Sequence, residues 1–222
     1  MNLVHTGWLA RLLGQETVCR VEGIADRFAL TFDDGPSPRN TPRFLEVLAK
    51  HGARATFFVL SRHARRHAAV LRGVHDAGHE IGLHGRDHFP PALLPGVALR
   101  YQVADALAAV GEACGHRPAC YRAPFGWLTR PQARVVRKLG LVPVLGDVYP
   151  EDPHEKSAAR IAQVTLSRLR PGSIVILHDS SVFGDAPRDA TLEALERILT
   201  ASAQSGLKAV SVRELLGMPA SE

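Results

Sequence analysis

The chain has 222 residues, of which 45% are hydrophobic and 22% charged, and its formal net charge is +5 at pH 7. This composition is that of one globular domain with a substantial core, and it excludes a disordered or low-complexity protein. Three cysteines without a Cys-x2-Cys spacing argue against a disulfide framework, and the absence of an aromatic-interleaved basic patch argues against a nucleic-acid partner.

The first 26 residues are expected to form an N-terminal extension. Their apolar stretch has no basic residue ahead of it and is interrupted at Arg11, so it fits neither a secretory signal nor a membrane span. If Met1 is the natural start, a cytoplasmic protein without stable membrane insertion is expected. Residues 217–222 are expected to be a short C-terminal tail.

Strand-like and helix-like segments alternate along the rest of the chain. Apolar, β-branched runs predict the strands, and amphipathic runs that start near proline or end at glycine predict the helices. The expected strands are 28–33, 55–60, 80–84, 119–122, 141–146, 173–178 and 208–212. The expected helices are 41–51, 63–77, 97–113, 130–139, 157–169 and 188–204. Such alternation predicts an α/β fold with right-handed crossovers and a parallel sheet.

Two adjacent carboxylates, Asp33 and Asp34, end the first expected strand, and Gly35-Pro36 then turns the chain. Neighbouring carboxylates repel each other, and a bound cation is one reason for a fold to hold them together. The alternative is that Asp, Gly and Pro are ordinary turn-forming residues. Because successive side chains of a strand point to opposite faces, we expect the two aspartates to have different roles.

Two histidines, His84 and His88, follow the third expected strand. Gly82 and Gly85 favour a strand end that runs into a loop, where both imidazoles could converge on one ion. Surface histidines are the alternative, because the chain has 11 of them.

Two later segments place further polar side chains directly after expected strands. Arg122 follows a short strand and precedes Ala-Pro-Phe125-Gly, and His178-Asp179 ends the apolar run that begins at Ile174. A fully apolar run of this kind predicts a buried parallel strand whose last side chain reaches the active-site face.

Taken in order, four segments resemble the motifs of the polysaccharide deacetylase family, the NodB-homology domain of carbohydrate esterase family 4. They are Thr31-Phe-Asp-Asp-Gly-Pro36, His84-x3-His88, Arg122-Ala-Pro-Phe-Gly126 and Leu177-His178-Asp179. The resemblance spans about residues 28–216, and it implies a deacetylase domain over 27–216. It also implies a distorted (β/α)7 barrel related to the TIM barrel, in which the chemistry gathers at the C-terminal strand ends.

The resemblance further implies a metal-dependent deacetylase that acts on an N-acetylated sugar, oligosaccharide or carrier-linked glycan. Its metal ligands would be Asp34, His84 and His88, holding a divalent ion, Zn²⁺ first, with Co²⁺, Ni²⁺ or Mn²⁺ as alternatives. Asp33 would be the general base toward the attacking water, and His178 the general acid toward the leaving amine.

Arg122 resembles the family's arginine that orients and charge-pairs the base, and the alternative is an ordinary surface salt bridge. A backbone N–H near Phe125 would stabilise the oxyanion. Trp127 and Leu177 would line the acetyl pocket, although ordinary packing is an alternative for an aromatic residue at a barrel mouth.

The sequence departs from the family pattern at two places. Gly85 stands where the family usually has Ser or Thr, so one supporting hydrogen bond is missing or supplied otherwise. The fourth motif is degenerate and has no tryptophan: it reads Leu145-Gly-Asp147-Val-Tyr-Pro-Glu-Asp152-Pro153. The partner of His178 is therefore open between two aspartates. Asp147 is preferred because it directly follows an apolar strand, and Asp152 is predicted to be a turn-forming surface carboxylate.

Two other functions stay open at this point. One is an amidohydrolase of the same fold that acts on a non-sugar amide, and the other is a carbohydrate-binding pseudoenzyme with a decayed site. Because all three ligands, Asp33 and His178 are present, the sequence weighs against the pseudoenzyme. The short loops and the lack of a carbohydrate-binding module favour a small soluble or lipid-linked glycan over insoluble chitin or mature peptidoglycan. The oligomeric state is open.

Overall fold

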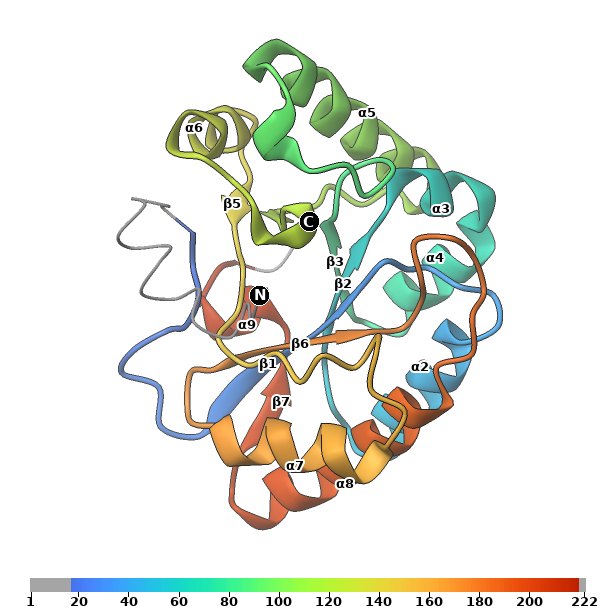
Figure 1. Cartoon of the computed structure of the whole chain (residues 1–222), viewed down its shortest axis with the longest axis vertical. Coiled ribbons are helices and arrows are strands. Elements are labelled where there is room, and N and C mark those ends of the chain that lie inside the picture. Colours follow the sequence, from blue (N-terminus) through green and yellow to red (C-terminus); the bar gives the residue numbers. More distant parts are fainter. Residues whose placement is uncertain (1–16, 220–222) are drawn as a thin grey trace.

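The computed structural model describes residues 17–219, so the start of the expected N-terminal extension and the last three residues of the tail lie outside the described residues. The strands form one curled parallel sheet with helices packed around it (Figure 1). This arrangement confirms the predicted α/β fold with its distorted barrel of seven strands.

Seven strands make up the sheet in the described part of the chain. They are β1 (Arg27–Asp33), β2 (Thr56–Val59), β3 (Glu80–Leu83), β4 (Cys120–Tyr121), β5 (Val142–Pro143), β6 (Ile174–His178) and β7 (Lys208–Val210). Their order is β5-β4-β3-β2-β1-β6, and β7 also pairs with β1. A parallel bridge between Val148 and Val175 joins the segment after β5 to β6. The two ends of the strand order are thereby brought together, and the sheet curls toward closure.

The helices follow the predicted alternation. They are α2 (Thr41–Lys50), α3 (Ser61–Arg66), α4 (Ala68–Asp76), α5 (Gly96–Cys114), α6 (Arg130–Lys138), α7 (Ala158–Arg168), α8 (Asp189–Gln204) and α9 (Val212–Leu215). Two 3-10 turns, η2 (Pro91–Leu93) and η3 (Pro124–Gly126), lie in the loops after β3 and β4. In residues 17–219 no helix combines the length and apolar character that crossing a bilayer requires.

The prediction of one continuous helix over 63–77 is wrong, because the structure has two helices there. The backbone leaves the helical region at His67, with φ −126° and ψ 44°, and this divides the segment into α3 and α4. The two halves have different neighbours: His63 of α3 is buried against the Asp34 carbonyl, whereas Leu71 and Val74 of α4 pack in the core. The short helix α9 was not predicted.

Strand β1 lies at the centre of the sheet. Its later residues, Thr31–Asp33, pair with β2, its earlier residues, Arg27–Ala29, pair with β7, and β6 covers the other edge. The side chains of Phe28, Leu30 and Phe32 are fully buried, so burial of apolar area fixes the strand in place. In this register Asp33 lies directly opposite His178, and two predicted functional residues meet at the carboxyl edge of the sheet.

Candidate active site

Three predicted metal ligands come together at the carboxyl ends of β1 and β3. One ligand atom from each of Asp34, His84 and His88 lies within 4.8 Å of the other two. Asp34 Oδ1 is 3.7 Å from His84 Nε2 and 3.6 Å from His88 Nε2. Two imidazoles and a carboxylate held about 2.0–2.2 Å from a tetrahedral zinc ion would stand roughly 3.3–3.6 Å apart, so the spacing fits such an ion.

The chemistry of the donor atoms also fits a cation. Asp34 Oδ1 is buried and has no hydrogen-bond partner within the described residues. His84 Nδ1 lies 2.9 Å from the Arg122 carbonyl oxygen, which can only accept, so Nδ1 carries a proton and Nε2 is the ring atom that faces Asp34. Burial, followed by the neighbouring His84, lowers the pKa of His88 to about 4, so this ring is neutral and able to ligate.

The backbone at the site adopts conformations that side chains rarely allow. Asp34, His88 and Phe125 have φ values of 72°, 59° and 59°. A non-glycine residue with positive φ costs energy and persists where the surrounding structure fixes it, often at a functional site. Gly85 also has a left-handed φ of 85°, a conformation that favours glycine over the family's usual Ser or Thr. Here the Arg122 carbonyl supplies a supporting hydrogen bond to His84.

Asp33 is paired with a buried arginine. Arg122 Nη1 donates to Asp33 Oδ1 at 2.7 Å and to Thr31 Oγ1 at 2.7 Å, and the arginine is 1% exposed. Burial alone would raise the pKa of Asp33, but the charges of Arg122, His84 and His178 outweigh it and lower that pKa. Asp33 is therefore held ionised. The surface salt bridge considered for Arg122 is excluded by its burial.

Arg122 also packs against the ring of Phe58. Its guanidinium carbon lies 4.1 Å from the centre of the Phe58 ring, which adds a cation–π interaction to the ion pair. Phe58 in turn packs over Gly82, where an added Cβ would lie 2.6 Å from the ring. The arginine is thus placed by a phenylalanine that needs a glycine beneath it.

His178 is held by Asp152, and the predicted preference for Asp147 is wrong. Asp152 Oδ1 lies 2.9 Å from His178 Nδ1, and its Oδ2 accepts from the His178 backbone N–H and from Thr191 Oγ1, each at 3.0 Å. Asp152 is 3% exposed, so it is not the surface turn residue that was expected. Burial opposes protonation of His178, but the Asp152 carboxylate, with Asp34 and Asp33, raises its pKa to about 9.

Asp147 has a different position. Its Oδ1 accepts from the Ile174 backbone N–H at 2.8 Å, and its Oδ2 accepts from Ser173 Oγ at 3.1 Å. These contacts lie at the start of β6, at the other end of the strand from His178. The position of Asp147 just after β5 did not predict the partner of His178. The chain continues for five more residues, to Asp152, before it reaches the carboxyl edge of the sheet.

Two supporting residues were not assigned a role from the sequence. His63 Nδ1 contacts the Asp34 carbonyl oxygen at 2.8 Å. Asp179 accepts from the Thr41 hydroxyl and packs so closely under Gly35 that a Cβ there would lie 2.6 Å from Asp179 Oδ1. Burial, partly offset by the Thr41 hydrogen bond, raises the pKa of Asp179 to about 7. Both residues hold the turn that carries Asp34.

Aromatic side chains border the site. Phe125 and Trp127 are 47% and 51% exposed, their ring centres are 6.0 Å apart, and the Phe125 ring lies 4.6 Å from that of His88. Tyr149, which the sequence reading did not single out, has its ring 6.0 Å from that of His178. Leu177, predicted to contact substrate, is fully buried in the hydrophobic core.

Comparisons with known proteins show which family the chain matches in sequence and in fold. A family model described as polysaccharide deacetylase matches residues 21–144. A chitooligosaccharide deacetylase of Azorhizobium caulinodans is 34% identical over 198 residues, which cover 86% of this chain and 93% of the relative. A peptidoglycan-N-acetylglucosamine deacetylase of Bacillus cereus is 30% identical over 190 residues, 85% of this chain and 87% of the relative. The crystal structure of a peptidoglycan N-acetylglucosamine deacetylase shares the fold with a TM-score of 0.87, at 24% identity over 96% of this chain and 97% of that one.

Proposed function

The chain belongs to the polysaccharide deacetylase family, and on this premise we propose that it is a metal-dependent hydrolase of the N-acetyl group of a sugar or oligosaccharide. One observation carries the proposal. The Asp34, His84 and His88 cluster lies beside Asp33, which is held ionised, and His178, whose raised pKa keeps it protonated. A base and an acid with opposite pKa shifts beside a metal-binding cluster suit hydrolysis of an amide.

Asp34, His84 and His88 would hold the ion, and we propose Zn²⁺ because two imidazoles and one carboxylate form an open, borderline donor set. When bound, such an ion polarises a carbonyl and lowers the pKa of water. The remaining chemistry belongs to the side chains around it.

Asp33 would accept the proton of the attacking water as the new C–O bond forms. Arg122 keeps the Asp33 carboxylate ionised and donates to its Oδ1 at 2.7 Å, which leaves Oδ2 available. Asp33 Oδ2 lies 3.8 Å from His84 Nε2, so the available oxygen faces the proposed ligand cluster.

His178 would donate the Nε2 proton to the amide nitrogen as the C–N bond breaks. Asp152 binds Nδ1, so the ring is fixed in orientation and the imidazolium is stabilised until the amine leaves. The products are acetate and a free amine, and the proton taken by Asp33 balances the one given by His178.

The substrate class follows from the relatives and from the border of the site. The relatives' names specify chitooligosaccharide and peptidoglycan N-acetylglucosamine, and exposed Phe125 and Trp127 offer flat apolar faces to a sugar ring. We propose a small N-acetylated oligosaccharide or carrier-linked glycan. A non-sugar amide is the second candidate, since the catalytic groups alone do not distinguish it.

Mass spectrometry of N-acetylated oligosaccharides incubated with the purified protein tests this proposal. Loss of acetyl groups with wild type, and not with Asp33→Asn or after chelation, is expected. Turnover of simple amides without turnover of any acetylated sugar would favour the second candidate. A protein that binds sugar and releases no acetate would be a pseudoenzyme.

A further inference from the structure

Helix α5 has an apolar outer face. Val97 and Tyr101 are 68% and 75% exposed, and Ala104, Ala108 and Gly111 continue the same face at helical spacing and are also exposed. A surface helix is normally polar on its water-facing side, so this face is unusual for a domain surrounded only by water.

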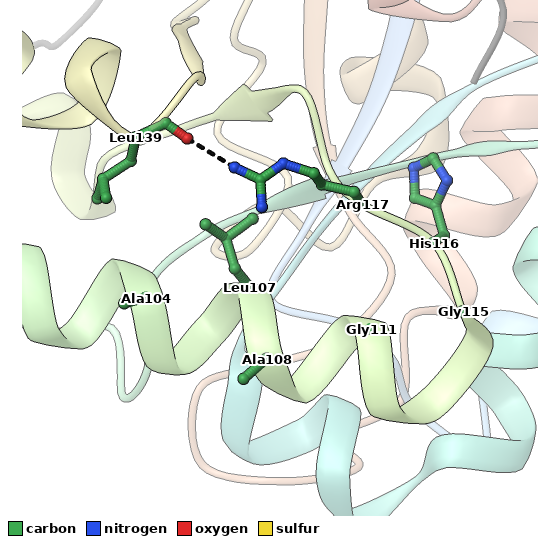
Figure 2. Close-up of a pocket in the computed structure, with 8 residues that line it drawn as sticks. All are labelled: Ala104, Leu107, Ala108, Gly111, Gly115, His116, Arg117 and Leu139. Carbon is green, nitrogen blue, oxygen red and sulfur yellow. Dashed lines mark hydrogen bonds between the residues drawn. The ribbon is translucent and has the colours of Figure 1, made fainter. Parts of the chain in front are cut away.

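The face is extended at both ends. Leu93 of η2, just before the helix, is 67% exposed. Farther along, α5 borders a shallow groove of about 480 Å³ whose other wall includes Arg117 and Leu139 (Figure 2). The groove is lined mainly by small and apolar side chains, and Arg117 at its edge donates to the Leu139 carbonyl at 2.9 Å.

Positive charge gathers beside this face. Residues 88–146 contain seven Arg or Lys and only two Asp or Glu, and all the basic residues except buried Arg122 are exposed. One of the two acids, Asp105, is paired with Arg65 at 2.6 Å. Helix α6 has no acidic residue, and its basic side chains are all exposed: Arg130, Arg134, Arg137 and Lys138.

The two helices are packed together. Gln132 of α6 donates to the Pro91 carbonyl at 2.5 Å and to the Leu94 carbonyl at 3.1 Å, which ties α6 to the start of the apolar face. A Cβ at Gly96 would lie 3.6 Å from Val135 of α6. In Figure 1 both helices lie at the upper end of the molecule, whereas α7 and α8 lie at the lower end.

We propose that this α5–α6 surface, the exposed face of η2 and α5 together with the basic side chains of α6, docks on an anionic lipid bilayer. An apolar helix face beside basic side chains is the combination that binds the boundary of a membrane with anionic headgroups. A second copy of the chain is disfavoured because self-association would bring two basic α6 helices together.

Docking there would also orient the site. The loop between β3 and α5 carries both His88 and Phe89, and Phe89 is 47% exposed. The same loop leads directly into Leu93 and α5. The carboxyl edge of the sheet would therefore lie near the lipid surface, where a lipid-carried glycan is presented.

Flotation of the full chain with vesicles tests the proposal. We expect binding to phosphatidylcholine vesicles that contain phosphatidylglycerol, little binding to phosphatidylcholine alone, and release by salt. Replacing both Arg134→Gln and Lys138→Gln should weaken the partition coefficient by roughly thirtyfold. The pair Val97→Ser and Tyr101→Ser should weaken it by about tenfold at unchanged lipid charge.

A matched control removes the same charge at the other end of the molecule. Lys156→Gln with Arg160→Gln removes two exposed charges just before and in α7. It should leave vesicle binding within about twofold of wild type, because α7 lies at the opposite end of the molecule from α5 and α6 (Figure 1). No binding to anionic vesicles, or equal loss with the α6 and α7 pairs, would overturn the proposal. A doubled mass by light scattering that Val97→Ser with Tyr101→Ser reduces, with vesicle binding unchanged, would assign the face to a second copy instead.

Discussion

The two ends of strand β6 are each held by an aspartate from the segment between β5 and α7. The two aspartates differ in the side chains to which they are hydrogen-bonded. At the start of the strand, Asp147 accepts from a backbone N–H and a serine hydroxyl. At its end, Asp152 accepts from a backbone N–H and also binds the ring of His178. The contacts of Asp147 fix the strand, whereas those of Asp152 also raise the pKa of His178, the acid of the proposed reaction.

The same contrast extends across the sheet. Near the amino ends of the strands, buried Glu80 accepts from Thr56 Oγ1 at 2.6 Å, which joins β3 to β2, and from the Arg213 backbone N–H at 2.9 Å, which joins β3 to α9. At the carboxyl ends, Asp34 Oδ1 is buried without a hydrogen-bond partner among the described residues. Glu80 Oε1 also lacks a hydrogen bond among the described residues, but it lies 3.8 Å from Arg213 Nε, whereas Asp34 Oδ1 lies beside the imidazoles of His84 and His88.

The largest effect should come from Asp34→Asn. An amide oxygen is a weaker ligand than a carboxylate, so elemental analysis should find the bound metal largely lost, and deacetylation should fall to background. His84→Ala and His88→Ala should behave alike. Asp147→Asn makes the same carboxylate-to-amide change at the start of β6, away from the ligand cluster. It is the matched control and should retain the metal. Full metal content in Asp34→Asn would remove this residue from the proposed ligand set.

Asp33→Asn should lower kcat by roughly 10²–10⁴-fold while the metal stays bound, because it removes a base and not a ligand. His178→Ala should have an effect of the same order, since it removes the acid. Steady-state kinetics with parallel metal analysis separate this result from the previous one. If Asp33→Asn emptied the site, the roles of the two aspartates would be reversed.

A smaller effect is expected from Asp152→Asn, seen in the pH–rate profile. The raised pKa of about 9 keeps His178 protonated, so activity should decline only as pH rises through that value. Without the Asp152 charge the His178 pKa falls, and the alkaline limb should move to lower pH by about 1–3 units. Asp147→Asn should leave the limb in place. An equal shift in both variants would remove the distinction between the two ends of β6.

The smallest effect is expected on stability, and here Asp147 is the aspartate that matters. Asp147→Asn loses acceptor capacity for the Ile174 N–H and Ser173, which should lower the free energy of unfolding by about 1–3 kcal/mol. Chemical denaturation at neutral pH measures it, with kcat of the folded variant as the control. A large loss of kcat at unchanged stability would mean that Asp147 acts on the reaction after all.

The sheet and the alternation of elements could be predicted because they depend on local pattern, and the cluster of Asp34, His84 and His88 followed from the resemblance to the family's motifs. Hydrophobic runs mark β1 and β6, and residues directly after a strand must lie at its carboxyl edge. The break of the helix at His67 depends on what each half contacts, which no local pattern records.

The partner of His178 could not be found in the same way. Asp147 and Asp152 are five residues apart in one irregular segment, and only the path of that segment decides which reaches β6 at its end. Tyr149 and Asp179 were missed for a related reason, since their roles come from ring packing and from a close approach to Gly35. Asp152 had one available signal, its place in the degenerate fourth motif.

The contact of Gly82 with Phe58, and of Phe58 with Arg122, separates two properties of the site that could otherwise change together. In the proposed function, substrate preference would depend on the loops that carry Phe125, Trp127 and Tyr149, whereas the ionisation of Asp33 depends on Arg122, which packs on buried Phe58. Substitutions at the border of the site are therefore expected to change substrate preference while leaving Asp33 ionised. Conversely, a single methyl group at position 82, where the chain has no side chain at all, would displace Phe58 and alter reactivity toward every substrate alike.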